Sequence, residues 1–100
     1  MSNTSLNKTE VLERIREERD ELTRRFSVRR IGLFGSVAND RNKPDSDVDI
    51  LVELDEPTFD HYMDLKFFLE EAFEHSVDLV LADTVKPRIR PIIEREVIYV

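Results

Sequence analysis

Apolar residues recur every three or four positions between residues 9 and 26, and glutamate and arginine fill the remaining positions. This spacing predicts a single amphipathic helix with one buried face and one wet face. A charge-laced outer face is typical of simple solvation, so we assign no function to it. The apolar stripe consists of Val11, Leu12, Ile15, Leu22 and Phe26.

Two strands are predicted in the middle of the chain. Residues 28–34 are predicted to form a strand that ends at Gly35, where glycine permits backbone conformations closed to other residues, and the turn there opens a short helix. Residues 47–54 alternate in character, so their apolar side chains share one face. Asp47 and Asp49 then lie together on the other face, where a buried strand would not carry charge.

The second half of the chain continues the alternation of helix and strand. A helix is predicted over 60–74, a third strand over 77–81, a short helix with Pro87 in its first turn, and a final strand over 97–100. This order predicts an α/β (α+β) fold, in which a small mixed sheet carries helices mainly on one face.

Composition narrows the class of protein. One hundred residues with 40% hydrophobic content predict a single domain over 1–100, with its core over about 9–100. A formal net charge of -7 argues against long nucleic acid as a partner. The absence of cysteine excludes disulfides and zinc-thiolate sites.

The chain shows no targeting or membrane signal. Its amino terminus has no apolar signal region, and no stretch approaches the roughly 20 apolar residues that span a bilayer. We therefore expect a soluble, cytoplasmic protein without a membrane partner.

Asp47 and Asp49 are the first candidates for chemistry. On an extended strand they lie about 7 Å apart on one face, and two carboxylates this close raise each other's pKa unless a cation lies between them. Hard oxygen ligands without nearby histidine or cysteine favour Mg2+ or Mn2+ over zinc. Such an ion commonly completes its shell with phosphate oxygens, which points to a nucleotide triphosphate as the substrate.

Gly35 and Ser36 are the second candidates. A glycine turn that opens a helix exposes backbone N–H groups to an anion, and the serine hydroxyl adds a donor. A Gly-Ser pair alone is far more often an ordinary turn with a helix cap. The ten residues that separate Ser36 from the Asp47-x-Asp49 pair favour a phosphate site.

Asp78 is the third candidate, because a carboxylate inside an apolar strand is costly unless something compensates its burial. If its strand neighbours that of Asp47 and Asp49, all three carboxylates converge. Asp78 would then act as general base or as ligand of a second metal ion. Alternatively, Asp78 faces solvent at a strand edge.

These residues resemble the DNA polymerase beta type nucleotidyltransferase superfamily, and most closely its minimal nucleotidyltransferases, the MNT domains of bacteria and archaea. The resemblance spans roughly residues 9–100. It implies that Gly35 and Ser36 hold ATP or another nucleoside triphosphate, and that Asp47, Asp49 and Asp78 bind two Mg2+ ions, with Mn2+ as a substitute. In-line attack would release pyrophosphate and leave a nucleoside monophosphate on the acceptor.

The small members of this family are similar to antitoxins encoded beside helical HEPN toxins, to which they bind and whose tyrosine they modify with AMP. The resemblance thus implies a HEPN-type partner and a homo- or hetero-oligomer, and Met63 and Phe67 would suit such a contact. One departure is Asn39-Asp40, where many relatives have Arg-Gly. Two alternatives stay open: a noncatalytic MNT module that neutralises its toxin by contact, and a metal-dependent hydrolase.

Overall fold

The computed structural model describes residues 6–100. From α2 onward helices and strands alternate along the chain as the apolar pattern predicts, with a short 3-10 helix, η1, in addition. The elements are α1 Lys8–Glu17, α2 Arg19–Phe26, β1 Val28–Phe34, α3 Gly35–Ala38, β2 Val48–Leu54, α4 Phe59–Phe73, β3 Val77–Leu81, η1 Ala82–Thr84, α5 Arg90–Glu96 and β4 Ile98–Tyr99. No helix within residues 6–100 is long and apolar enough to cross a bilayer.

The four strands form one mixed sheet in the order β3-β2-β1-β4. β1 runs antiparallel to both β2 and β4, whereas β2 and β3 are parallel. Parallel neighbours need a crossover connection, and α4 supplies it. The predicted fold class is therefore confirmed.

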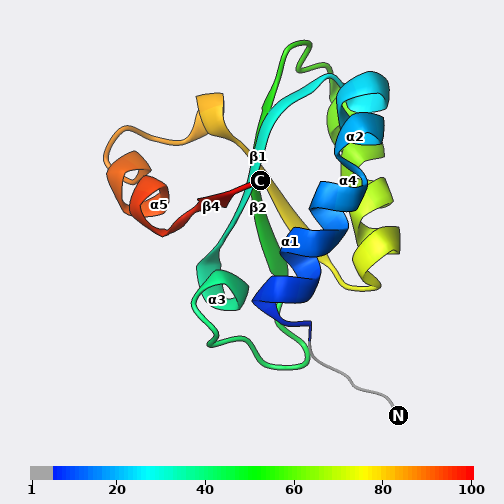
Figure 1. Cartoon of the computed structure of the whole chain (residues 1–100). Helices are drawn as coiled ribbons and strands as arrows, with labels where there is room; N and C mark the ends of the chain where they lie inside the picture. Colours follow the sequence, from blue (N-terminus) through cyan, green and yellow to red (C-terminus); the bar gives the residue numbers. More distant parts are fainter. Residues whose placement is uncertain (1–5) are drawn as a thin grey trace.

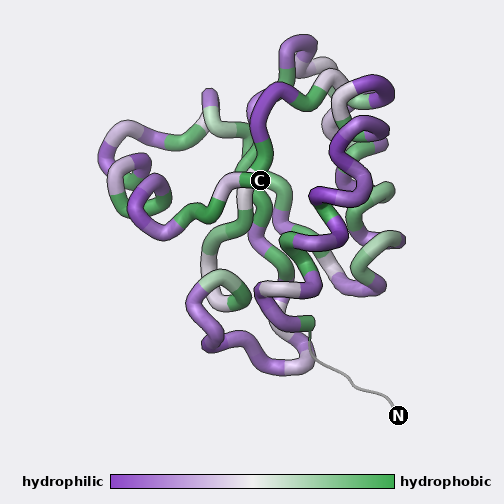
Figure 2. The backbone as a smooth tube through the Cα atoms, in the orientation of Figure 1, coloured by the Kyte–Doolittle hydropathy of each residue, from purple (hydrophilic) through white to green (hydrophobic). Residues whose placement is uncertain are grey.

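Three helices cover one face of this sheet (Figure 1). The side chains that β1 and β2 direct at α1, α2 and α4 are fully buried, whereas the outer surfaces of α1 and α2 are mostly hydrophilic (Figure 2). α5 lies on the other side of the sheet and covers it only in part. This uncovered face is where the candidate carboxylates point. The buried sheet residues on the helix-covered face are Val28, Ile31, Leu33, Val48, Ile50, Val52, Leu54, Val77 and Leu79, and Leu51 is buried on the other face.

The first helix begins as its sequence suggests but does not continue to residue 26. Asn7 caps α1 by accepting the Glu10 N–H at 2.8 Å, and the Glu10 carboxylate accepts the Asn7 N–H in return. The prediction of one helix is wrong at Glu18, where ψ is 6° and α2 starts anew. The apolar stripe is interrupted at this point by Glu18 and Arg19, and Arg19 instead donates to the Arg29 carbonyl at 3.0 Å.

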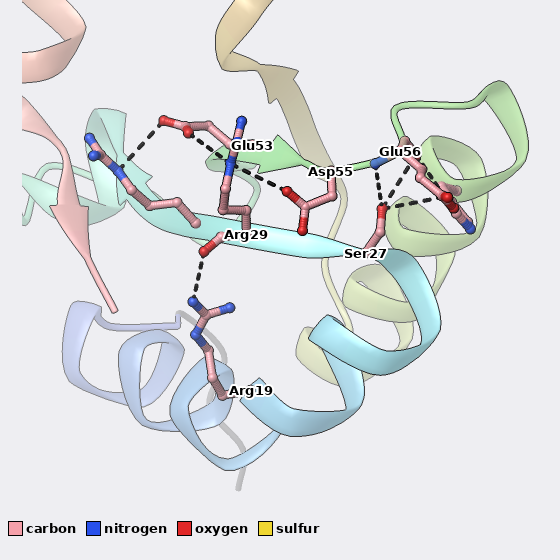
Figure 3. A network of polar contacts seen from close by, with 8 residues as sticks. Arg19, Ser27, Arg29, Glu53, Asp55 and Glu56 are labelled. Atoms are coloured by element: carbon pink, nitrogen blue, oxygen red, sulfur yellow. Dashed lines mark hydrogen bonds and ion pairs between the residues drawn. The ribbon is translucent and has the colours of Figure 1, made fainter.

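The junction between α2 and the sheet is held by polar contacts (Figure 3). Ser27 adopts a left-handed φ of 57° and ends α2, and its hydroxyl accepts the Glu56 N–H at 3.0 Å. Beside it, Arg29 pairs with both Glu53 and Asp55 at 3.6 Å. These contacts fix the end of the β1–β2 hairpin against the helical layer.

The outer edge of β3 is covered by side chains rather than by another strand. Val77 donates its N–H to the Glu70 carboxylate at 3.0 Å, and the Leu79 carbonyl accepts the Tyr62 hydroxyl at 2.6 Å. The Leu81 carbonyl accepts the Thr84 hydroxyl at 2.8 Å. Alternate residues of a strand direct their backbone groups to the same side, so these three bonds occupy one outward-facing row.

Removal of the Tyr62 hydroxyl should weaken this edge. We expect Tyr62→Phe to lower the free energy of unfolding by about 1 kcal/mol, because a half-buried carbonyl loses its partner. Urea denaturation of both proteins measures the difference. Equal midpoints and slopes would show that water replaces the hydroxyl at no cost.

The carboxyl-terminal segment differs from the prediction in detail. Pro87 lies in a turn before α5 and not in its first turn, which holds Pro91 instead. The final strand is confirmed but is limited to Ile98–Tyr99. Gly32 lies opposite Tyr99, and a Cβ at Gly32 would come within 2.6 Å of the Val97 side chain, so only glycine allows β4 to dock.

Candidate active site

The pairing of β2 with β3 brings two of the candidate carboxylates together. Asp49 lies directly opposite Asp78 in the parallel register, and both side chains point to the sheet face away from α1, α2 and α4. Asp47 is exposed and lies one residue before β2. Asp78 is exposed on the edge strand β3, as the solvent-facing alternative predicted. It is not isolated there, because it lies beside Asp49.

Gly35 closes the other side of the Asp49 carboxylate. Its φ of 78° lies in the left-handed region, and a Cβ at this position would overlap the Asp49 carboxylate. The bare Gly35 backbone therefore packs against Asp49 directly. Ser36 follows in the first turn of α3, so the predicted glycine-serine turn and the carboxylates belong to one site.

Negative charge accumulates here, and among residues 6–100 the only charges that act on Asp49 are those of Asp78 and Asp47. Partial burial, together with the negative charges of Asp78 and Asp47, raises the pKa of Asp49 from 3.8 to about 6. A hydrogen bond with the Asp78 side chain also favours the protonated form of Asp49 and so contributes to the raised pKa. Carboxylates packed this closely occupy a place suited to a cation.

The donor set fits a hard divalent metal ion such as Mg2+ or Mn2+, which prefers carboxylate oxygens and usually takes one or two of them from the protein. Within residues 6–100, no three or more acidic or imidazole side chains are close enough to enclose a metal ion. Asp49 and Asp78 are thus the two carboxylates that lie side by side in the candidate site. Asp47 lies near enough for its charge to raise the pKa of Asp49.

The loop between Ser36 and Asp47 is anchored to the start of α1. Asn42 donates to the Leu6 carbonyl at 2.8 Å, and Lys8 pairs with Asp40 at 3.4 Å. Asp40 has a left-handed φ of 58°, a conformation that glycine adopts without strain, which explains why a glycine suits this position. The Asp40 carboxylate is directed at Lys8. The sequence gives no signal for Asn42, because its contact joins residues 36 positions apart.

The two apolar residues considered for partner contact lie elsewhere. Met63 is half-buried and Phe67 is 57% exposed, and both belong to α4, which covers the opposite face of the sheet from Asp49. A partner held there would not present its acceptor group to the carboxylates from the same surface.

Comparison with known proteins decides the family. A family model described as a nucleotidyltransferase domain matches residues 12–100, a range that includes every candidate residue. The chain belongs to the nucleotidyltransferase family. This nucleotidyltransferase is accordingly an enzyme, and the resemblance inferred from the sequence is confirmed.

Relatives of this nucleotidyltransferase agree with that assignment. It is 44% identical over 81 residues to the protein adenylyltransferase MntA of Thermococcus cleftensis, covering 80% of this chain and 82% of the relative. A solved structure described as a candidate minimal nucleotidyltransferase is 34% identical, with a TM-score of 0.79 over 96% of this chain and 98% of the other.

A more distant structure shares the fold alone. This structure is described as a tri-AMPylated Shewanella oneidensis HEPN toxin in complex with MNT antitoxin. The matched chain of the complex is 20% identical to this nucleotidyltransferase. The TM-score is 0.63, over 89% of this chain and 70% of the matched chain.

Proposed function

We propose that this nucleotidyltransferase moves AMP from ATP to a hydroxyl group of a partner protein, and that the partner is a HEPN-type toxin which the modification inactivates. The observation that carries the proposal is the Asp49–Asp78 pair packed against the bare backbone of Gly35. It joins a site for cationic charge to a turn suited to phosphate.

The phosphate end of ATP is assigned to Gly35 and Ser36. The backbone N–H groups of this turn and the Ser36 hydroxyl are donors that suit the β- and γ-phosphates. Asp47, Asp49 and Asp78 would hold Mg2+, with two ions in the full site. When bound, Mg2+ supplies neutralisation of the charge that develops on the phosphate oxygens.

We assign Asp78 as the general base that accepts the proton of the acceptor hydroxyl. It is exposed on the edge strand, so an acceptor hydroxyl can approach it from solvent, and its neighbour Asp49 lies on the inner side. The acceptor oxygen bonds to the α-phosphorus, the bond to the pyrophosphate oxygen breaks, and the hydroxyl proton passes to the Asp78 carboxylate. The products are the AMP-modified protein and pyrophosphate.

The protein acceptor and the adenine nucleotide are supported by the relatives. One is named a protein adenylyltransferase, and a protein of the same fold is held in a complex whose toxin carries AMP. These observations favour modification of a protein over hydrolysis of a nucleotide.

Intact-mass measurement after incubation with ATP, Mg2+ and the co-encoded helical partner tests the proposal. We expect one or more AMP masses on the partner, and we expect Asp47→Asn to reduce the modified fraction by at least about a hundredfold, because charge-stabilising groups contribute on this scale. Asp20→Asn, on the surface of α2, is the matched control and should retain transfer.

The result also separates the alternatives. A stable complex with unchanged masses, and neutralisation of the toxin that survives Asp47→Asn, would establish a noncatalytic binding module instead. Release of free phosphate without pyrophosphate would indicate a hydrolase.

A further inference from the structure

A cavity of about 110 Å3 lies between α5 and the sheet face that carries the carboxylates. The residues that line it come from β2 and β4, from η1 and the following turn, and from α5. Its lining residues are Leu51, Glu53, Ala82, Asp83, Val85, Arg90, Ile93, Glu94 and Tyr99.

This cavity continues the surface of the candidate active site. Leu51 follows Asp49 by two residues on β2, so it points to the same face about 7 Å further along the strand. Gly32 lies opposite both Leu51 and Tyr99, which places these two lining residues in one row across the sheet. A nucleotide whose α-phosphate lies at Asp49 therefore reaches the cavity with its nucleoside end.

The charge of the cavity sets which end of a nucleotide it accepts. Three carboxylates line it, against one lining cation, Arg90, while Arg30 stacks on the Tyr99 ring at 3.8 Å. Arg90 is already engaged, because its guanidinium donates to the Ala82 carbonyl at 3.1 Å and to the Val85 carbonyl at 3.3 Å. Phosphate is repelled here, whereas a group that donates N–H bonds is favoured.

Two of the three carboxylates are free to accept such bonds. Glu53 pairs with Arg29 and Arg30 at 3.6 Å each, and Figure 3 shows it held in that network. Asp83 and Glu94 are exposed and form no ion pair with any residue in the range 6–100, and Glu94 acts on the Arg30 guanidinium only through its charge. Apolar walls beside them come from Leu51, Val85 and Ile93, with the Tyr99 ring at one end.

We propose that this cavity receives the nucleobase, and that Asp83 and Glu94 select a base with an exocyclic amino group, such as adenine. The proposal rests on the proposed function, because it takes the triphosphate to lie at Gly35 and Ser36. Apolar walls bury the faces of the ring while the carboxylates accept the amino hydrogens, the usual division of roles in a small-molecule site.

Nucleotide binding by the full chain, with Mg2+ and without any acceptor protein, tests the proposal by calorimetry. The probes are ATP and purine riboside triphosphate, which differs from ATP only in lacking the 6-amino group. We expect the wild-type chain to prefer ATP by about tenfold, the scale of one hydrogen bond to a charged group. The double variant Asp83→Ala, Glu94→Ala should lose this preference, and the matched surface pair Glu13→Ala, Asp20→Ala should keep it.

A second variant fills the cavity. Val85→Trp should weaken ATP by at least about tenfold and leave inorganic tripolyphosphate unchanged, because the phosphate end lies outside the cavity. Equal affinity of the two nucleotides for the wild-type chain, or a preference that survives the loss of both carboxylates, would overturn the proposal. If AMP transfer to the partner persists in that case, the proposed function stands and only the base site is rejected.

Discussion

The variant Asp49→Asn is expected to lose nucleotidyl transfer by about a thousandfold or more and to become more stable than the wild type when no metal ion is present. The loss follows because the variant removes the central carboxylate of the site, which lies between Asp78 and the Gly35 backbone. The gain follows because the same carboxylate is held ionised near two like charges at neutral pH.

The sign of the stability change depends on pH. The native pKa of Asp49, about 6, lies above its ordinary value of 3.8, so the native state holds this proton more tightly than the unfolded chain. The corresponding stability is fully present below about pH 4 and is lost as pH rises towards 6. The shift corresponds to about 3 kcal/mol, which solvent screening at this partly exposed site reduces to about 1–2 kcal/mol.

Thermal denaturation of both proteins at pH 4 and pH 8 measures this effect. At pH 8 without metal, Asp49→Asn should melt roughly 5 °C or more above the wild type, and at pH 4 the difference should nearly vanish. Added Mg2+ should raise the melting temperature of the wild type but not that of the variant. A variant that is less stable at pH 8 would show that Asp49 is needed for the fold and not strained by its neighbours.

Replacement of Gly35 with alanine is expected to have the second largest effect, since it damages both fold and site. The left-handed φ of 78° costs a side chain about 1–3 kcal/mol, and the new methyl group overlaps the Asp49 carboxylate. Displacement of that carboxylate by about 1 Å is sufficient to reduce transfer by about a hundredfold.

A double-mutant cycle separates the two causes. Gly35→Ala in an Asp49→Gly background should recover part of the lost stability, because the overlap disappears while the backbone strain remains. Chemical denaturation of the four proteins gives the coupling free energy. Strict additivity would mean that Asp49 moves aside without cost, and that contact between the two residues does not define the site.

The main features of the site could be predicted because they depend on short-range patterns. Alternation along one strand places Asp47 and Asp49 on the same face, and the apolar run around Asp78 identifies a second strand. The helix between these strands is long enough for a crossover, and the structure shows that they are parallel neighbours. From the sequence alone the meeting of Asp49 and Asp78 stays conditional on this pairing, which only the fold supplies.

Other features depend on contacts that no local pattern encodes. The helix break at Glu18 arises from an interrupted apolar stripe and from a bond between Arg19 and a strand ten residues away. The loop anchor at Asn42 joins distant segments, and the cavity under α5 exists only once Tyr99 has docked beside Gly32. The position of α5 was also beyond prediction, because its start is set by Pro91 and not by Pro87.

The covered edge of β3 has a consequence for how copies of the chain behave at high concentration. An unprotected edge strand is a template onto which another chain can add its own strand, and this is a common start of aggregation. Here Glu70, Tyr62 and Thr84 already occupy one outward backbone group each of Val77, Leu79 and Leu81, in the strand that carries Asp78. The enzyme can thus leave its reactive sheet face open to solvent while the end of that sheet resists extension into fibres.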